Sequence, residues 1–177
     1  MIERLAEPMA GDGCRAEPLA EKHRDALREA CAEDLDIWQI YYVSYAPDEF
    51  DASFDALLER PWIPFALFDG DAFVGMSCYI NIDDSRQALE IGSTYYRPEF
   101  RGIGFNRRCK DMMMRHAFER GYRRIEFRVD SRNQRSQAAM KKLGAVREGV
   151  MRADRITWNG HVRDTVLFSI LKEEWPV

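Results

Sequence analysis

The amino-acid sequence predicts an α/β (α+β) fold, in which helices flank a sheet, and three observations support this. The 177 residues are about one domain's worth, and the hydrophobic share of 46% argues against disorder. Several segments alternate apolar and polar residues, as half-buried strands do. Two helical patterns lie between such strands in the second half. We therefore expect a single domain over residues 1–177, with a strand–helix–strand unit in its middle and a loose lead-in at residues 1–13.

Periodicity and stop signals place the individual elements. Residues 19–33 have helical spacing, and a short helix is expected at about 53–59. Gly121 and Gly144 end the two later helices, because glycine is favoured after a helix C-terminus. Asn159-Gly160 is a strong hairpin signal between the last two strands. The predicted strands are 63–68, 74–82, 88–96, 124–130, 146–157 and 163–171, and the later helices are 105–120 and 133–143.

Cysteine usage and hydropathy indicate the compartment. The four cysteines form no C-x-x-C pair, so small buried thiols are expected rather than a zinc or redox site. His23 and His161 have no partners at metal-ligand spacing, and no metal is expected. The N-terminus lacks an apolar signal core, and residues 37–47 are too short a stretch to span a bilayer, which needs about 20 residues. We expect a cytoplasmic protein that does not bind membranes.

Residues 90–106 carry the clearest chemical signal. A strand runs into Arg101-Gly102-Ile103-Gly104, and a helix begins directly afterwards. The glycines let backbone N–H groups approach a ligand, and the helix start adds unpaired donors and the positive end of a dipole. Basic residues surround this turn. The sequence therefore predicts an anion site, although the dinucleotide-binding and Walker patterns are both absent.

Two motifs carry a resemblance to a known family. Arg101-x-x-Gly104-x-Asn106 resembles the Arg-x-x-Gly-x-(Gly/Ala) pyrophosphate loop of the GNAT N-acetyltransferase superfamily. The segment from Asn133 to Leu143-Gly144 is similar to its second signature, in which an Asn opens a helix that Leu-Gly ends. The later strands and hairpin are similar to the RimJ/RimL-like branch. The resemblance implies a mixed, mostly antiparallel sheet of about six to seven strands.

The resemblance also implies where acetyl-CoA binds. The cofactor would lie in a V-shaped opening between the strands at 88–96 and 124–130. Backbone N–H groups of about residues 103–107 would bind its pyrophosphate, and Asn133 would bind it from the opposite side, unless that residue is a plain N-cap. The implied cofactor-binding residues are Tyr95, Tyr96, Arg101, Gly102, Ile103, Gly104, Phe105, Asn106, Arg107, Arg108 and Asn133.

The implied reaction is direct attack of a neutral amine on the thioester, with a base for the amine proton and an acid for the thiolate. Backbone N–H groups near residues 93–95 would polarise the carbonyl. Many family members carry a tyrosine acid where this chain has Met140, and a thioether cannot donate a proton. RimL-like enzymes suggest Ser136 as the replacement donor. Glu90 is the candidate base, acting through water. The alternatives are a helix-capping Ser136 and a solvated Glu90.

The leading hypothesis is an acetyl-CoA-dependent N-acetyltransferase whose acceptor is a peptide or protein N-terminal amine or a small amine. Trp38, Tyr41 and Tyr42 either line the acceptor pocket or cover the sheet edge. A non-catalytic acyl-CoA-binding or sensor module is the alternative. A nucleic-acid partner is disfavoured because the basic residues are spread over many elements. By analogy with the superfamily, we expect a homodimer.

Charge is unevenly distributed along the chain. Residues 1–88 hold 7 basic and 19 acidic residues, whereas residues 89–177 hold 19 and 11. The basic excess is concentrated at 97–124, around the predicted phosphate loop, and the acidic excess at 33–60, in the segment expected to cover the acceptor. We therefore expect the acidic segment to attract a protonated amine.

Overall fold

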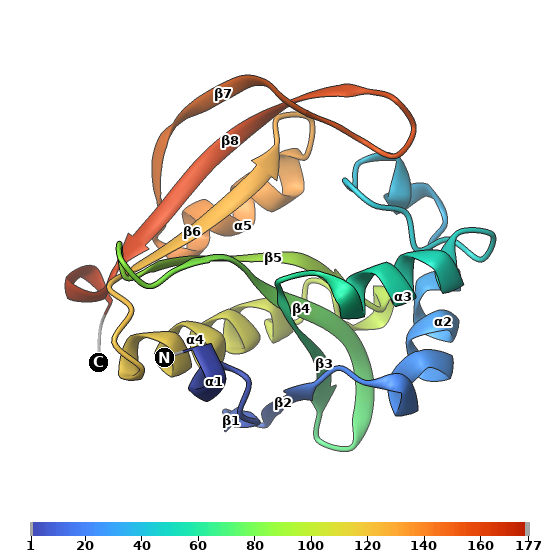
Figure 1. Ribbon diagram of the computed structural model, residues 1–177, viewed down its shortest axis with the longest axis horizontal. Coiled ribbons are helices and arrows are strands. Elements are labelled where there is room, and N and C mark those ends of the chain that lie inside the picture. The colour runs from blue at the N-terminus through green and yellow to red at the C-terminus, as the bar shows by residue number, and fades with distance from the viewer. Residues whose placement is uncertain (1, 176–177) are drawn as a thin grey trace.

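The computed structural model describes residues 2–175, which form an eight-stranded sheet with helices on both faces (Figure 1). Neighbouring strands lie in the order β1-β2-β3-β4-β5-β6-β8-β7, and only β5 and β6 pair in parallel. The strands are β1 Met9–Gly11, β2 Cys14–Pro18, β3 Ile63–Asp69, β4 Ala72–Asp83, β5 Ala88–Tyr96, β6 Arg124–Asp130, β7 Val146–Ile156 and β8 Val162–Leu171. This confirms the mixed, mostly antiparallel fold, with eight strands where about six to seven were expected.

The α-helices are α1 Ile2–Leu5, α2 Arg24–Ala32, α3 Phe50–Glu59, α4 Phe105–Glu119 and α5 Gln134–Leu143. Short 3₁₀ turns occur at Glu21–His23, Asp36–Gln39, Pro98–Phe100 and Lys172–Glu174. Gly144 ends α5 in the left-handed conformation, as predicted. The helix expected at 19–33 is divided into a 3₁₀ turn and α2.

Two hydrophobic clusters cover the two faces of the sheet. Successive residues of β4 point to opposite faces, and Tyr79 packs in one cluster while Cys78 packs in the other. The first cluster contains the inner faces of α4 and α5, and the second contains α2 and α3. All four cysteines are free, buried thiols, which confirms that prediction. No helix within residues 2–175 is long and apolar enough to cross a membrane.

For residues 2–13, the expectation of a loose lead-in is wrong; residue 1 lies outside the described residues. β1 pairs with β2 in antiparallel register, Met9 opposite Ala16, and Leu5 is fully buried. His116 lies close to the Leu5 carbonyl, with 3.2 Å between Nε2 and the oxygen. The segment is too short to show a periodic pattern, so only its contacts with α4 and β2 order it.

The parallel pair β5 and β6 separates along its length (Figure 1). Pairing covers only Ala88–Arg124, Leu89–Ile125 and Glu90–Glu126, although β5 continues to Tyr96 and β6 to Asp130. The two strands therefore diverge beyond residue 90, and α4 connects them. This divergence is the V-shaped opening that the family resemblance implies.

The β7–β8 hairpin folds toward the segment between α2 and α3 (Figure 1). Its turn contains Gly160 at φ +81°, as the Asn-Gly pair predicts. The Trp158 indole N–H donates to the Trp38 carbonyl at 2.8 Å, and the Trp158 backbone N–H donates to the Tyr42 carbonyl at 3.1 Å. The hairpin tip is thereby joined to the segment that carries the predicted acceptor residues.

Candidate active site

The predicted anion loop lies between β5 and α4. Gly102 and Gly104 have left-handed backbones, with φ of +81° and +89°, and a Cβ on either would meet no heavy atom within 4 Å. The Arg108 N–H donates to the Gly104 carbonyl at 3.2 Å, which opens the helical ladder. The N–H groups of residues 103–107 precede that bond and have no acceptor within the helix. Open space and free donors at a helix start fit the pyrophosphate of CoA.

Two predicted phosphate-binding arginines are engaged in ion pairs within the protein. Arg101 pairs with Asp34 and donates through Nε to the Tyr96 carbonyl at 2.8 Å. Arg108 holds Asp69 with two bonds of 3.1 and 3.0 Å. Carboxylates therefore hold both guanidiniums, and of Arg101 only Nη2 has no hydrogen-bond partner within residues 2–175. The backbone N–H groups of the loop remain as donors for an anion.

The other loop residues divide by burial. Phe105 is fully buried and anchors the start of α4, Ile103 is 61% exposed, and Asn106 is half-buried. Arg107 is exposed and bonds to Asp111 at 3.1 Å and to a backbone carbonyl at the end of α5 at 3.0 Å. Asn106, in place of the usual Gly or Ala, leaves the backbone donors in position.

Tyr95 and Tyr96 point to opposite faces of the sheet. Tyr95 is fully buried, stacks on Trp38 with 5.0 Å between ring centroids and donates to the Ala30 carbonyl at 2.5 Å. Tyr96 is 8% exposed and packs edge-on against Phe105. Both rings belong to the core, so any contact between these residues and the pantetheine arm falls to their backbone.

Asn133 and Ser136 lie together where β6 leads into α5. Asn133 is the N-cap of α5, and its Oδ1 accepts the Ser136 backbone N–H at 2.9 Å. The Asn133 side-chain nitrogen takes no part in this bond and remains a donor. The Ser136 hydroxyl is half-buried and has no hydrogen-bond partner within residues 2–175. Met140 is buried among the core side chains under α5.

Glu90 is buried at the point where β5 and β6 cease to pair. It is 5% exposed, accepts a hydrogen bond from the Asn81 side chain at 2.7 Å and lies 3.4 Å from the Arg128 Nε. Burial raises the pKa of Glu90, and the Arg128 charge acts in the opposite direction. A carboxylate with a raised pKa is a stronger proton acceptor near neutral pH than a solvated one. The structure thus gives Glu90 the environment expected of a base.

Gly92 leaves the space that Glu90 occupies. A Cβ on Gly92 would lie 2.8 Å from the Glu90 Oε1 and 2.9 Å from the Ile80 Cδ1, closer than side chains pack. We expect Gly92→Ala to displace the carboxylate and lower kcat by roughly tenfold, less than the roughly 100-fold or more of a lost base, because the carboxylate is moved and not removed. Steady-state kinetics measure this. Gly149→Ala is the matched control, because its Cβ would meet nothing within 4 Å; equal kcat in both variants would contradict the expectation.

A bulge in β5 lies beside the opening. Met76 pairs with Tyr95 and Cys78 with Gly92, so two residues of β5 stand opposite one residue of β4. Ser93, the first of the two, has a left-handed backbone with φ +49°. A bulge interrupts the hydrogen-bond ladder, which leaves N–H groups near residues 93–95 able to face a ligand.

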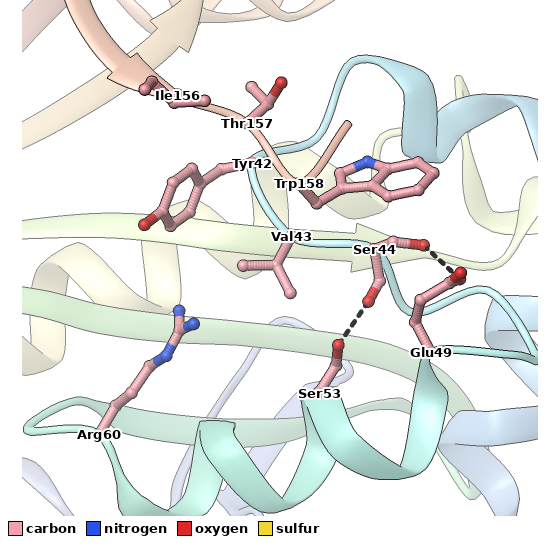
Figure 2. A pocket seen from close by; sticks show the side chains of 9 residues that line it. All are labelled: Tyr42, Val43, Ser44, Glu49, Ser53, Arg60, Ile156, Thr157 and Trp158. Atoms are coloured by element: carbon pink, nitrogen blue, oxygen red, sulfur yellow. Dashed lines mark hydrogen bonds between the residues drawn. The ribbon is translucent and has the colours of Figure 1, made fainter. Parts of the chain in front are cut away.

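A pocket of about 290 Å³ lies between the hairpin tip and α3 (Figure 2). Tyr42 and Arg60 lie on one side, and Trp158 and Glu49 lie on the other (Figure 2). The Ser44 hydroxyl donates to Glu49 at 3.1 Å. The full lining is Tyr42, Val43, Ser44, Glu49, Ser53, Arg60, Ile156, Thr157 and Trp158.

Of the predicted acceptor residues, only Tyr42 lines this pocket. Trp38 is 1% exposed, and its indole N–H donates to the Cys31 carbonyl at 3.2 Å. The Tyr41 hydroxyl donates to the Thr94 carbonyl at 2.6 Å. Trp38 and Tyr41 lie outside the lining of this pocket, because the core and the bulge of β5 hold these side chains. That they line the acceptor site stays a prediction.

Arginines neutralise much of the acidic segment at 33–60. The ion pairs are Glu33–Arg97, Asp34–Arg101, Asp51–Arg24, Asp51–Arg28 and Asp55–Arg24. Exposed pairs of this kind largely cancel each other's field. Glu49 is the acidic residue of this segment that lines the pocket, where it accepts the Ser44 hydroxyl.

Three groups in this region escape prediction from the sequence. Arg60 and Glu49 line the pocket, but each stands alone in a helix-end segment that carries no motif. Lys110, which the sequence suggests only as one of several basic residues near the loop, is 3% exposed.

Within residues 2–175 no group of three or more His, Cys, Asp or Glu side chains could hold a metal ion.

Fold and site together define a GNAT acetyltransferase: an anion-binding loop beside two diverging parallel strands. The sequence profile of the acetyltransferase (GNAT) domain matches residues 15–146, so the chain belongs to this family. Acetyl-CoA is the acetyl donor of the family, and the prediction of a GNAT N-acetyltransferase is confirmed at this level.

Individual relatives point the same way. A candidate ribosomal N-acetyltransferase, YdaF from Bacillus subtilis (strain 168), is 32% identical over 110 residues, which cover 62% of this chain and 58% of that protein. A candidate acetyltransferase from T. thermophilus has 35% identity over 96% of this chain and 91% of its own, with a TM-score of 0.87. Mycobacterium smegmatis RimJ, solved with CoA-disulfide, shares the fold at 19% identity over 96% of this chain and 88% of its own, with a TM-score of 0.78.

Proposed function

We propose that this chain is an acetyl-CoA-dependent N-acetyltransferase that acts on a primary amine by direct attack in a ternary complex. The acceptor is the N-terminal amine of a peptide or protein, or a small amine. The observation that carries the proposal is the buried Glu90 at the base of the opening between β5 and β6, together with the free N–H groups of residues 103–107 in the loop and helix start that follow β5. The description of YdaF as a candidate ribosomal N-acetyltransferase favours a protein acceptor.

Each residue has a defined task in this proposal. The N–H groups of residues 103–107 hold the pyrophosphate, and the free amide nitrogen of Asn133 binds from the α5 side. N–H groups at the bulge of β5 polarise the thioester carbonyl. Glu90 takes the amine proton through water, and Ser136 donates a proton on the leaving side. When bound, acetyl-CoA supplies the acetyl group. The predicted cytoplasmic location and homodimer stay predictions.

The decisive experiment has two stages. Millimolar acetyl-CoA should raise the melting temperature, as a ligand that binds only the folded state must. The protein is then incubated with acetyl-CoA and a panel of small amines and N-terminal peptides, with thiol release and mass spectrometry as readouts. An acetylated product is expected with at least one class. Stabilisation by acetyl-CoA without any product would contradict the proposed enzyme and support the acyl-CoA-binding module instead.

Ser136→Ala tests the proposed proton donor. We expect kcat to fall by about tenfold, less than the roughly 100-fold or more of a full general acid, because water can protonate the sulfur instead. The Kd for CoA should stay unchanged, because the Ser136 backbone N–H still donates to the Asn133 cap of α5. Ser85→Ala, in the exposed turn after β4, is the control and should keep full activity. If Ser136→Ala turns over at the wild-type rate, Ser136 has no part in the reaction.

A further inference from the structure

Lys110 is an unusual residue for the inner side of α4. Its side chain is 3% exposed, and Nζ donates to the Thr94 Oγ1 at 2.7 Å. Within the described part of the chain it forms no ion pair, and Thr94 is its sole hydrogen-bond partner. Burying an ammonium without a counter-charge costs several kcal/mol, and an apolar side chain would fill the position without that cost. The Lys110 ammonium therefore lacks a negatively charged partner within the described residues, and a bound ligand could provide one.

The position of Nζ is set by two strands. Thr94 belongs to β5, and the Phe127 ring, whose centroid lies 6.0 Å from Nζ, belongs to β6. Both residues come after Glu90 and Glu126, the last pair at which the two strands are hydrogen-bonded. Lys110 therefore lies between the strands where they diverge. It is five residues from the start of α4, about 8 Å along the helix from the phosphate loop.

The bulge of β5 is the other feature at this point. Thr94 follows Ser93 in the bulge, and its Oγ1 also lies 2.7 Å from the Ser77 Oγ. Lys110 thus approaches the bulge from the α4 side of the sheet. Glu90 points to the opposite face, next to Gly92. The two charged groups therefore approach the opening from different sides.

We propose that the Lys110 ammonium stabilises the negative charge that develops on the sulfur of CoA as the acetyl group leaves. The inference rests on the proposed acetyl transfer. The acceptor nitrogen bonds to the acetyl carbon, the carbon–sulfur bond breaks, and its electron pair moves to sulfur, where the Lys110 charge faces it. The acceptor's proton leaves through Glu90, and the sulfur is protonated by Ser136 or water, so protons and charge balance.

The electrostatic environment agrees with this role. Burial lowers the pKa of Lys110 to about 8, while the neighbouring Cys109 on α4, Cys78 on β4 and Glu90 on β5 act in the opposite direction. An ordinary thiol has a pKa of about 8.5. Lys110 is therefore charged at neutral pH, and its pKa is close to that of the thiol it would face. Since the charged form is the active one, kcat should fall as pH rises through about 8.

The first test measures binding alone. CoA bound to the protein is titrated by the ultraviolet absorbance of its thiolate. With wild-type protein, the bound thiol should have a pKa below that of free CoA. In Lys110→Met, which keeps the length and removes the charge, it should be about one unit higher or more than in wild-type. An identical thiol pKa in both proteins would overturn the proposal, and this readout holds even if no acceptor is found.

The second test uses turnover. Lys110→Met should lower kcat by ~10-fold or more and lose the alkaline limb of its pH profile, with KM for acetyl-CoA within about twofold of wild-type. Thr94→Val removes the hydrogen-bond acceptor but keeps the cation, so it should retain the alkaline limb. Lys22→Met, at an exposed lysine, is the control. A rise in KM with kcat and thiol pKa unchanged would show that Lys110 binds the pantetheine arm, which contradicts the proposal.

Melting temperatures separate these outcomes from misfolding. Lys110→Met replaces a buried charge by an apolar side chain, so it should melt no lower than wild-type. If Lys110→Met does not fold, the thiol of CoA bound to Lys110→Gln is titrated instead. Its pKa should again be higher than with wild-type protein. Absence of product with wild-type protein would refute the proposed function, whereas an unshifted thiol pKa would refute the role of Lys110 alone.

Discussion

Gly102→Asp is expected to lower the affinity for acetyl-CoA by about 100-fold and to leave the fold intact. The backbone at Gly102 is left-handed, φ +81°, a conformation that aspartate and asparagine tolerate better than other side chains. Its Cβ would meet no heavy atom within 4 Å, so the side chain has room. The new carboxylate would stand among the N–H groups that face the pyrophosphate. Two like charges at about 4 Å repel by up to about 4 kcal/mol near a surface, and 100-fold corresponds to about 2.7 kcal/mol.

Gly102→Asn is the matched control for this prediction. Asparagine has the same shape and the same backbone preference but no charge, so the difference between the two variants isolates electrostatics. Isothermal titration with CoA gives both affinities, and melting curves without ligand confirm that both proteins fold. Equal losses of affinity in the two variants would show that bulk alone blocks the loop, and the phosphate would then lie elsewhere.

Glu90→Gln should reduce kcat by about 100-fold or more, in the range of a lost general base. Burial raises the pKa of Glu90, and the base acts only when it is deprotonated. Wild-type activity should therefore rise with pH through that raised pKa. Glutamine cannot take a proton, so the variant should lose this acidic limb. Rates measured from pH 5 to pH 9 with saturating acetyl-CoA test the prediction, and an unaltered limb would remove Glu90 from the mechanism.

The same substitution has a stability consequence of defined sign. Because the folded-state pKa of Glu90 is raised, its protonated form favours folding, and this contribution is lost as pH rises through the folded pKa. Glu90→Gln should therefore be at least as stable as wild-type at pH 7. Chemical denaturation of the two proteins at that pH measures the difference.

Glu126 provides the matched control, since it faces Glu90 in the β5–β6 register. Burial acts to raise the pKa of Glu126, but hydrogen bonds from Arg124 and Arg128 outweigh burial and lower it. Its ionised form therefore favours folding above the unfolded pKa, and this contribution is lost as pH falls through the folded pKa. Glu126→Gln should lower stability at pH 7 and keep the acidic limb of activity. The two glutamates thus give opposite results.

Local signals in the sequence predicted much of the fold and the cofactor loop. The turn from Arg101 to Gly104 and the N-cap Asn133 depend on residues close in sequence, because a glycine turn and a helix start are made by consecutive residues. The alternation that marks β4 and β6 is also local. The bounds of β2 escaped prediction because its inward residues, Cys14 and Ala16, are small and Pro18 ends it.

The sequence by itself determined that the chain has a phosphate loop at a helix start, a second motif at Asn133 and a sheet of alternating strands. Only the tertiary structure decided which basic side chains near the opening are paired with carboxylates of the protein and which remain unpaired for a ligand. Arg101 and Arg108 are bound by carboxylates 67 and 39 residues away, and Lys110 lies just outside the apolar stripe of α4, so the sequence alone indicates an exposed residue. The divergence of β5 from β6 places Lys110 beside Thr94. The physical reason is range: backbone turns form between neighbours, whereas burial and ion pairing depend on which distant segments the sheet brings together.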